Sequence, residues 1–587
     1  MVKNILLALS CLVYLSGSVA QSYKSINPAS LDVNMLEGNA FYPGGAGFFN
    51  RLPRDAENKV RKDVWDLSQH TAGLKLRFKS NATEIIVRYV VSGGMQMPHM
   101  PATGVSGIDL YAKDIHGNWL WSGGSYSFGD TITYKFSGLL PGDGVHQKGR
   151  EYHLYLPLYN TVKWMEIKVP EESFFMPVQH TQEKPIVVYG TSIAQGGCAS
   201  RPGMAWPAIV NRKMDRPLIN LGFSGNGRLE KEVLDYIGMI DAKIFVLDCL
   251  PNLTGVDSSE VKLKVENAVK QLQALKAGVP ILLVEHCSFT DEALSPAKKK
   301  QYLVANAALK AAYKSLVASG VQNINLLSQK ELGLNIESMV DGIHPNDLGM
   351  MQYAEAYAKK LKVVLNEPDG NVSTTIPITQ YRDAAVYDWT IRHEEILSLQ
   401  KNQPVTIFMG NSITHFWGGE PLSSRRAGPV SWDKYFAALP AVNLGYGWDR
   451  IENVLWRVYH GELDNLEAKN IVINIGTNNL SVNNTDEEII KGLNHLIKAI
   501  QFRQSKAKIL LLGIYPRRGM EKRIEVINKK IRNLAGAMII GYDDPGTKLL
   551  QADGKIDELL FSDGLHPNEK GYDLLGNGIS EALKKLK

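Results

Sequence analysis

The pattern of apolar and polar residues divides the chain into an N-terminal β region and a longer region of alternating strands and helices. In the segment GLKLRFKS (73–80), leucine and phenylalanine alternate with lysine and arginine, the pattern of a half-buried strand. Similar short runs, separated by Gly, Pro and Asn, follow as TEIIVRYVV, GIDLYAKD, YHLYLPLYN and KWMEIKV. Several short strands without a convincing helix predict an all-β sandwich or jelly roll over residues 21–180.

From about residue 181 the apolar runs become short and continuous, and helical segments lie between them. PIVVYG, PLINLGF, AKIFVLDC and VPILLVEHC are typical of parallel strands that are buried on both faces. A polar stretch rich in turn residues at 366–379 predicts a linker. The same alternation of apolar runs and helical segments then begins again with PVTIFMG, ALPAVNLGYG, AKNIVINIG and AKILLLGIYP. We therefore predict two α/β domains with parallel sheets, at 181–365 and 380–587.

The composition indicates a folded, exported protein. The chain has 587 residues, of which 44% are hydrophobic and 21% are charged, and a net charge of +5 with no basic cluster, so we expect no nucleic-acid partner. Residues 1–20 combine Lys3, an apolar stretch and a small-residue cleavage site, and predict a signal peptide. We expect a periplasmic or extracellular protein without a stable membrane span. Lipidation at Cys11 is disfavoured because the preceding residues fit such a site badly.

Four landmarks occur twice, in the same order and at a nearly constant spacing. The phrase DGIHPN (341–346) returns as DGLHPN (563–568), and each copy precedes a helix-like stretch with Asn at the expected N-cap. The other landmarks are a serine after an apolar strand, an NLG turn and a downstream asparagine: Ser192 and Ser412, Asn220 and Asn443, Asn252 and Asn478. This repetition predicts two copies of one domain.

The landmarks point to acyl transfer by an activated serine. A serine in a tight turn after a strand is more often a helix cap when it stands alone. Paired with a downstream Asp-x-x-His, it becomes a nucleophile candidate, activated by an imidazole that the carboxylate orients. A glycine-rich turn and an asparagine at strand ends could donate to the oxyanion, although each taken singly is a common turn residue.

These residues resemble the GDSL/SGNH hydrolase family, over about 181–365 and 380–587. The resemblance implies two flavodoxin-like three-layer α/β/α domains, with Ser192, Asp341 and His344 as the first triad and Gly225 and Asn252 as oxyanion donors. In the second copy it implies Ser412, Asp563, His566 and the donor Asn478. The segment YDWTIRHEEILSLQ before the second copy is similar to the lead-in helix of bacterial relatives of platelet-activating-factor acetylhydrolase. The β region is similar to the domain that precedes some secreted SGNH esterases.

The second copy departs from the family pattern at Trp448, where a glycine is expected. A left-handed backbone conformation is unfavourable for tryptophan, so we expect that Gly447 supplies the N–H donor or that the loop is rearranged. We assign Trp448 to the acyl pocket, where an indole would favour acetyl over longer acyl groups. The motif's aspartate is replaced by Thr191 and Asn411, which do not belong to the triads. In the first copy the motif block that contains Asn252 reads DCLPN and departs from the family pattern, which leaves the placement of Asn252 less well defined.

No cofactor or metal is predicted. No nucleotide-binding glycine motif and no zinc spacing of His and Cys is present in the sequence. MQMPHMPATG brings Met95, Met97, His99 and Met100 together, which could hold copper, but an apolar loop resting on a neighbouring domain is the preferred interpretation. The mature chain would keep Cys198, Cys249 and Cys287. A disulfide between the last two is permitted, and buried free thiols are favoured.

Export, an additional β domain and two catalytic copies favour a bulky, multiply acylated substrate. We therefore predict a secreted serine esterase that removes small acyl groups, chiefly acetyl, from O-acylated polysaccharide, with acetylxylan or a pectic glycan as the leading substrates. This step rests on architecture. The alternatives are a lipid or phospholipid acyl esterase, and a glycan-binding protein in which one or both hydrolase copies are inactive.

Overall fold

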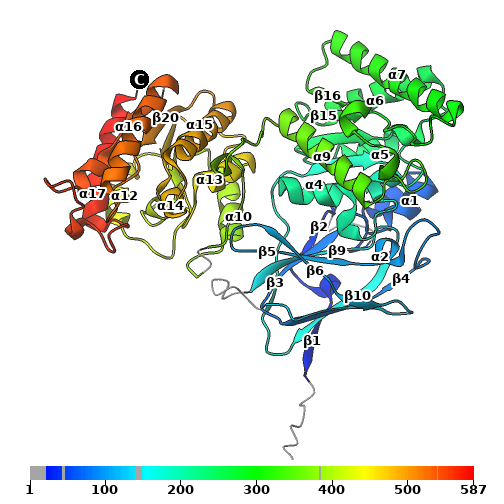
Figure 1. The fold of residues 1–587 in the computed structure, drawn as a ribbon, viewed down its shortest axis with the longest axis horizontal. Helices are drawn as coiled ribbons and strands as arrows, with labels where there is room; N and C mark the ends of the chain where they lie inside the picture. The colour runs from blue at the N-terminus through cyan, green and yellow to red at the C-terminus, as the bar shows by residue number, and fades with distance from the viewer. Residues whose placement is uncertain (1–20, 42–46, 141–148, 383–384, 539, 587) are drawn as a thin grey trace, which may run out of the picture.

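The chain forms a β-sandwich and two α/β domains, shown in Figure 1 at the bottom, upper right and left. The computed structural model describes residues 21–41, 47–140, 149–382, 385–538 and 540–586. The predicted signal peptide, including Cys11, lies outside the described residues. The α/β and all-β architecture predicted from the sequence is confirmed. Among the described helices, none is both long and apolar enough for a membrane span.

The sandwich consists of two antiparallel sheets that enclose one apolar core. One sheet has the order β1-β10-β4-β8-β7, and the other has the order β11-β3-β9-β5-β6, with β2 added at β3. Side chains such as Phe78, Val87 and Leu154 meet in the core, fully shielded from solvent. The elements are β1 (Tyr23–Ile26), β2 (Leu36–Glu37), α1 (Lys62–Ser68), β3 (Lys75–Ser80), β4 (Glu84–Val91), α2 (Ala102–Val105), β5 (Asp109–Lys113), β6 (Trp119–Ser122), β7 (Ser125–Ser127), β8 (Ile132–Ser137), β9 (Arg150–Tyr155), β10 (Val162–Pro170) and β11 (Phe175–Pro177).

The first α/β domain has a parallel sheet with the order β13-β12-β14-β15-β16 and helices on both faces. Its strands are buried along almost their whole length, because helices cover both sides of the sheet. This order is the doubly wound flavodoxin type. The elements are β12 (Ile186–Gly190), α3 (Ser192–Gln195), α4 (Trp206–Met214), β13 (Leu218–Gly222), α5 (Lys231–Ile237), β14 (Ile244–Asp248), α6 (Ser258–Leu275), β15 (Ile281–Val284), α7 (Pro296–Ala318), β16 (Ile324–Leu327), α8 (Gln329–Leu332) and α9 (Asp347–Val364).

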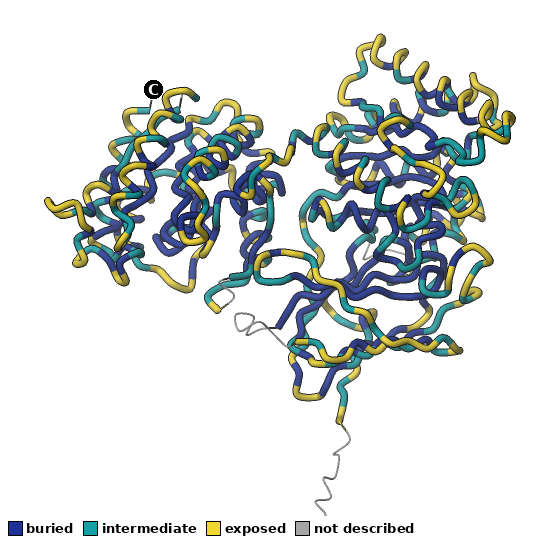
Figure 2. Tube along the Cα trace, viewed as in Figure 1, coloured by how far each residue is buried: buried dark blue, intermediate teal, exposed yellow. Residues whose placement is uncertain are grey.

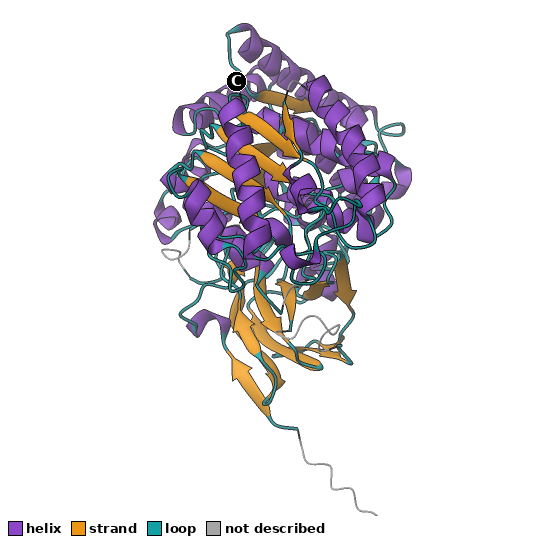
Figure 3. Ribbon diagram, turned by 90° about the vertical axis from the view of Figure 1, so that its left-hand side faces the viewer, coloured by secondary structure: helices purple, strands orange, loops and turns teal. Residues whose placement is uncertain are grey.

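The second α/β domain repeats this arrangement, with the strand order β18-β17-β19-β20-β21. Figure 3 shows its strands between layers of helices, with the sandwich below. The elements are α10 (Trp389–Leu399), β17 (Thr406–Gly410), α11 (Ser412–His415), α12 (Pro429–Phe436), β18 (Ala441–Gly445), α13 (Ile451–Tyr459), β19 (Asn470–Asn474), α14 (Thr477–Ser481), α15 (Asp486–Arg503), β20 (Lys508–Leu512), α16 (Glu521–Met538), β21 (Gly541–Asp543) and α17 (Glu569–Lys585).

A short segment upstream of most of the sandwich packs as part of the first α/β domain. Leu52 and Val64 belong to the same apolar core as the strands β12 and β13. The buried Arg51 guanidinium donates to the carbonyl oxygens of Asn220 (3.1 Å) and Gly222 (2.8 Å) at the end of β13. The β region therefore contains a helix, α1, that the sequence pattern did not indicate, and most of the sandwich is inserted between this lead-in segment and β12.

The second domain has an equivalent arginine directly before its first strand. Arg392 on α10 donates to the carbonyl oxygens of Asn443 (2.9 Å) and Gly445 (2.8 Å) at the end of β18. These two residues correspond to Asn220 and Gly222 of the first copy. A lead-in arginine thus satisfies the strand-end carbonyls of both copies, although it reaches the first copy from a distant part of the sequence.

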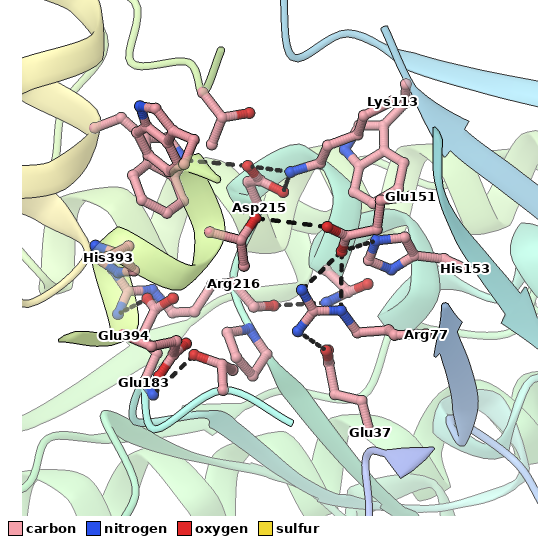
Figure 4. A pocket seen from close by; sticks show the side chains of 18 of the residues that line it. Glu37, Arg77, Lys113, Glu151, His153, Glu183, Asp215, Arg216, His393 and Glu394 are labelled. Atoms are coloured by element: carbon pink, nitrogen blue, oxygen red, sulfur yellow. Dashed lines mark hydrogen bonds and ion pairs between the residues drawn. The ribbon is translucent and has the colours of Figure 1, made fainter. Parts of the chain in front are cut away.

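The three domains meet at a buried, charged junction (Figure 4). Strand β3 was expected to expose its charged face, but Lys75, Arg77 and Lys79 are all buried there. Arg77 pairs with Glu37 (3.2 Å) and Glu151 (2.7 Å), and Lys79 pairs with Asp388 at the start of α10. The expectation of a half-buried strand is therefore wrong, because other domains cover the polar face. The counter-charges come from neighbouring strands of the sandwich and, for Lys79, from Asp388 of the second α/β domain.

Further polar contacts join the two α/β domains directly. Asp215 of the first domain accepts from Lys113 of the sandwich (2.6 Å) and from the indole of Trp456 in the second domain (3.1 Å). Arg216 pairs with Glu367 (3.1 Å) and also donates to the Tyr459 carbonyl oxygen. Figure 2 shows buried segments (dark blue) in the interior of each domain and exposed segments (yellow) mainly at the periphery. Because one unpaired buried charge is costly, this network favours a single relative orientation of the domains.

Candidate active sites

Each copy places its serine at the carboxyl end of the central strand of three neighbours. Ser192 begins α3 directly after β12, and Thr191 caps that helix by accepting from the Ile193 N–H. Ser412 begins α11 directly after β17, and Asn411 is the corresponding cap. The caps explain why the aspartate of the family motif is replaceable here by Thr or Asn, since all three side chains accept at an N-cap.

In the first copy the predicted triad residues form a continuous hydrogen-bonded chain. Ser192 Oγ lies 2.8 Å from His344 Nε2, and His344 Nδ1 lies 2.7 Å from Asp341 Oδ2. The other carboxylate oxygen of Asp341 accepts from the backbone N–H groups of Ile343 (3.2 Å) and His344 (2.9 Å). The turn thereby fixes the carboxylate, and the carboxylate fixes the imidazole.

The second copy has nearly the same geometry. Ser412 Oγ lies 2.9 Å from His566 Nε2, and His566 Nδ1 lies 2.7 Å from Asp563 Oδ2. Asp563 Oδ1 accepts from the N–H groups of Leu565 (3.0 Å) and His566 (2.8 Å). The asparagines that end the two DG-x-HPN phrases cap α9 and α17, as the sequence predicts. The six-residue phrase therefore encodes both the acid–base pair and the start of the following helix.

The triad carboxylates remain ionised over the neutral range. Partial burial raises the pKa of Asp563, but the hydrogen bonds from His566 outweigh burial, so that its pKa falls to about 2. Partial burial also raises the pKa of Asp341, and the backbone and side-chain hydrogen bonds from His344 again bring it below its ordinary value. An ionised carboxylate can orient the neutral imidazole and stabilise the imidazolium that forms when a serine proton is taken up.

The predicted donor residues of the first copy lie after the two strands that flank β12. Gly225 follows β13 in a left-handed conformation (φ +70°), and a Cβ atom there would meet open space. Asn252 ends a short 3₁₀ turn (Leu250–Asn252) after β14, and its Oδ1 accepts from the Gly227 N–H (3.0 Å). That bond orients the amide and leaves its NH₂ group as a donor.

In the second copy, Trp448 takes the conformation of the glycine that it replaces. Its φ is +63°, close to that of Gly225, so the loop is not rearranged. The Gly447 N–H donates to His415 Nδ1 (3.1 Å) and is therefore already engaged. No described residue accepts from the Trp448 N–H. The position of Trp448, and not that of Gly447, thus corresponds to Gly225, and Trp448 as a residue is 49% exposed.

Asn478 also lies beside this turn. It sits on α14 directly after β19, and its Nδ2 donates to the Asp449 carbonyl oxygen (2.9 Å). An amide NH₂ group carries two hydrogens, so one remains for a ligand. The asparagines of the NLG landmarks have a different role, because Asn220 and Asn443 donate to the carbonyl oxygens of Ala194 and Thr414 and so tie each serine helix to the neighbouring strand.

Sequence reasoning missed a residue that holds the turn in each copy. In the first, Gln195 Oε1 accepts from the Ser224 N–H (3.0 Å). In the second, His415 Nδ1 accepts from the Gly447 N–H, which occupies the corresponding position. Both residues lie three positions after their serine, a spacing that could have singled them out. Because His415 Nδ1 accepts a hydrogen bond, its proton must be on Nε2.

The sandwich contributes to the surroundings of the first site. The exposed His99 ring lies 6.0 Å from the His344 ring, centroid to centroid, and the Tyr159 hydroxyl donates to the Ser192 carbonyl oxygen (3.2 Å). Met97 and Met100 pack against the first α/β core, so the prediction that this loop rests on a neighbouring domain is confirmed. The second site instead has Phe416, whose ring lies 5.6 Å from the His566 ring.

The three described cysteines are buried and free. Within the described ranges, no three His, Cys, Asp or Glu side chains are arranged to hold a metal ion.

Comparisons with known proteins agree with the repeat. The GDSL-like lipase/acylhydrolase family matches at residues 183–362 and again at 408–574, and a family of N-terminal regions of SGNH-hydrolase-type esterases matches at 23–175. Platelet-activating factor acetylhydrolase IB subunit alpha2 of Rattus norvegicus is 30% identical over 202 residues, which cover 34% of this chain and 81% of the relative. The human alpha2 subunit is 29% identical over 204 residues, covering 34% and 84%. A crystal structure described as a GDSL-like lipase from Bacteroides ovatus is 29% identical with a TM-score of 0.54, covering 59% of this chain and 98% of that one.

Proposed function

The chain belongs to the GDSL-like lipase/acylhydrolase family, and on that premise we propose that both copies are active serine esterases. The observation that carries the proposal is the pair of Ser–His–Asp chains, which agree within 0.1 Å in each distance between side chains. An inactive copy would have no reason to keep this geometry. A glycan-binding protein without catalysis is therefore disfavoured.

The reaction begins with acyl transfer to serine. The serine Oγ attacks the ester carbonyl carbon, and its proton passes to Nε2 of His344 or His566. The intermediate collapses, the alcohol leaves with the proton from the imidazolium, and an acyl-enzyme remains. Water, deprotonated by the same histidine, then attacks the acyl-enzyme and releases the carboxylic acid and the free serine.

The oxyanion of each tetrahedral intermediate requires donors that are already in place. In the first copy we assign this role to the Gly225 N–H and the Asn252 amide. In the second we assign it to the Asn478 amide and to the Trp448 N–H, in place of Gly447, whose N–H is bound to His415. Each such donor typically contributes about 2.7–4 kcal/mol to the stabilisation of the transition state.

We propose that the substrates are O-acylated polysaccharides and that the protein is exported. The sequence of residues 1–20, the presence of a sandwich beside the first site and two catalytic copies on one chain support this proposal. Removal of acetyl groups is favoured in the second copy, because an indole at the oxyanion turn would restrict a longer acyl chain. A lipid acyl esterase is the second candidate, supported by the name of the platelet-activating-factor acetylhydrolase relatives.

Acetate release tests the proposal. Wild-type protein should release acetate from native O-acetylated xylan or pectin and none from the same glycans after chemical deacetylation. A pre-steady-state burst of p-nitrophenol from p-nitrophenyl acetate would report the acyl-enzyme. Hydrolysis of an acetylated phospholipid analogue with no release from any acetylated glycan would overturn the glycan assignment in favour of the lipid.

A further inference from the structure

The two sites differ in the charge of the segment that follows the fourth strand of the sheet. The Thr290 N–H donates to the Gly342 carbonyl oxygen (3.0 Å), and the Arg518 N–H donates to the Gly564 carbonyl oxygen (2.8 Å). These bonds place the two segments in register against the DG-x-HPN turns. Phe289 of the first copy therefore corresponds to Arg517 of the second.

Arg517 lies beside a predicted oxyanion donor. Its guanidinium donates to the carbonyl oxygen of Thr477 (3.2 Å), the residue before Asn478, and to Ser481 Oγ (2.9 Å). Among the described residues no carboxylate forms an ion pair with it. Two hydrogen bonds to neutral oxygens leave most of its five N–H donors, and its whole charge, for another partner.

A second unpaired arginine lies on the histidine side of the same site. The Arg425 guanidinium lies 4.7 Å from the centre of the Phe416 ring, and that ring lies 5.6 Å from the His566 ring. Arg425 is exposed, and no described carboxylate pairs with it. A guanidinium fixed on an aromatic face is a preferred ligand for carboxylates and phosphates.

Each copy has one arginine at the oxyanion turn. Arg228 donates to the Gly225 carbonyl oxygen (3.0 Å), and Arg382 donates to the Trp448 carbonyl oxygen (2.9 Å). These two arginines do not distinguish the copies, but the other neighbouring charges do.

At the first DG-x-HPN turn, the Asp291 carboxylate faces Gly342 and pairs with Lys298. At the second turn the Arg518 guanidinium lies beside Gly564, and Glu558 neutralises its charge. The additional positive charge that distinguishes the second site therefore comes from Arg517 and Arg425.

We propose that the second copy accepts esters whose alcohol part carries an anionic group, a carboxylate or a phosphate, which Arg517 and Arg425 bind. The proposal rests on the proposed esterase function and deepens it. The first copy has Phe289 in place of Arg517 and the Asp291 carboxylate beside its DG-x-HPN turn, so its preference for the anion is weaker. The tandem copies would then remove acyl groups from differently charged units.

The test compares one anionic substrate with its neutral counterpart on the full chain. The Ser192→Ala variant, in which only the second copy can react, is given O-acetylated methyl galacturonoside and the methyl ester of its uronate group. An O-acetylated methyl galactoside 6-phosphate distinguishes a carboxylate from a phosphate as the bound group. We expect kcat/KM to be about tenfold higher for at least one anion than for the neutral ester, as for one charge-assisted hydrogen bond.

Two variants locate the preference. In the Ser192→Ala background, Arg517→Gln and Arg425→Gln should each reduce the anionic-to-neutral kcat/KM ratio several-fold. Arg532→Gln is the matched control. It removes the same charge from an exposed position on α16, where the guanidinium rests on Tyr542, and should leave the ratio unaltered. The Ser412→Ala variant, which reports the first copy, should show a weaker preference for the anion.

The possible failures are distinguishable. If the Ser192→Ala variant hydrolyses the neutral and anionic esters equally, or if the ratio survives both arginine substitutions, the charge preference is refuted and the esterase function stands. If this variant hydrolyses none of these esters and no p-nitrophenyl acetate, the proposed function of the second copy fails, and the charge preference fails with it.

Discussion

The two hydrolase copies share one catalytic geometry but differ in what surrounds it. The first site is bordered by His99 and Tyr159 of the sandwich, whereas the second is bordered by Phe416 and Trp448 of its own domain. The triad distances nevertheless differ by no more than 0.1 Å. The side chains of the proposed triads thus keep one geometry, while the residues around them differ between the copies.

Removal of both nucleophiles should give the largest effect and tests whether both copies react. Ser192→Ala and Ser412→Ala should each abolish part of the esterase activity on p-nitrophenyl acetate. The double variant should lose on the order of 10⁵–10⁶ in kcat, because only binding and oxyanion stabilisation remain. If one single variant is as inactive as the double variant on every ester tried, the other copy is inert and the comparison of two active sites is broken.

The oxyanion asparagines should give the next largest effect. Asn478→Ala in the Ser192→Ala background should lower kcat by about 10²–10³ with little change in KM, because in the proposed role the amide acts on charge that develops only in the transition state. Asn252→Ala in the Ser412→Ala background is the matched measurement on the first copy. An unchanged kcat in either case would assign that asparagine to the turn alone.

The residues that hold the oxyanion turn should give an effect of about tenfold. His415→Ala removes the acceptor of the Gly447 N–H. The kcat of the second copy should therefore fall roughly tenfold, the effect expected from the free energy of one hydrogen bond. His415→Gln restores the side chain that the first copy uses at this place and should recover most of the rate. Equal losses in both variants would show that the turn does not depend on this bond.

Substitutions at the oxyanion turn itself should change the acetyl-to-butyryl ratio of kcat/KM about threefold. Trp448→Gly in the Ser192→Ala background should raise kcat/KM for p-nitrophenyl butyrate relative to the acetate, because the indole would exclude bulk from the acyl pocket that we propose it lines. Gly225→Trp in the Ser412→Ala background is the reciprocal change, at a position where a side chain meets open space. An unaltered acetyl-to-butyryl ratio after Trp448→Gly would mean that the indole does not line the pocket.

A smaller effect should appear in stability against pH. Burial, with Arg392 and Arg457, lowers the pKa of His415 from 6.5 to about 2. The unfolded chain therefore binds a proton below pH 6.5 that the folded chain does not bind. The contribution of His415 to the free energy of unfolding is complete above pH 6.5 and declines as the pH falls towards 2.

The measurement is the difference in Tm between wild type and His415→Gln. This difference should move in favour of the variant as the pH is lowered from 7.5 to 5. A difference that stays constant over this range would mean that His415 is protonated in the folded protein as readily as in the unfolded one.

The local parts of the sites could be read from the sequence because their partners are close along the chain. In DG-x-HPN the carboxylate, the N–H groups that it accepts from and the imidazole that it orients lie within four residues. The strands buried on both faces could also be predicted, because helices cover both sides of the sheet in each copy and the strands are therefore continuous apolar runs. Trp448 shows the limit: its position was identified, but the sequence could not decide whether the loop would tolerate its left-handed backbone.

Interactions between domains could not be read in this way. The alternation of Leu and Lys in β3 correctly predicts a strand, but the burial of its charged face depends on Asp388, about three hundred positions away. The lead-in segment of the first copy was missed for the same reason. Arg51 shares little with the sequence around Arg392 beyond the guanidinium, and its acceptors lie beyond the whole sandwich.

The inserted sandwich has a consequence for synthesis. Arg51 and the carbonyl oxygen of Asn220 are 169 residues apart, so the lead-in segment leaves the ribosome long before the strand end that it caps. At ordinary elongation rates this delay is roughly 10–30 s. During that time the sandwich can fold, while Leu52 and Val64 have no core to enter. The first hydrolase copy must therefore be completed late and from both sides of a folded insertion, whereas the second copy can assemble in one continuous stretch as it emerges.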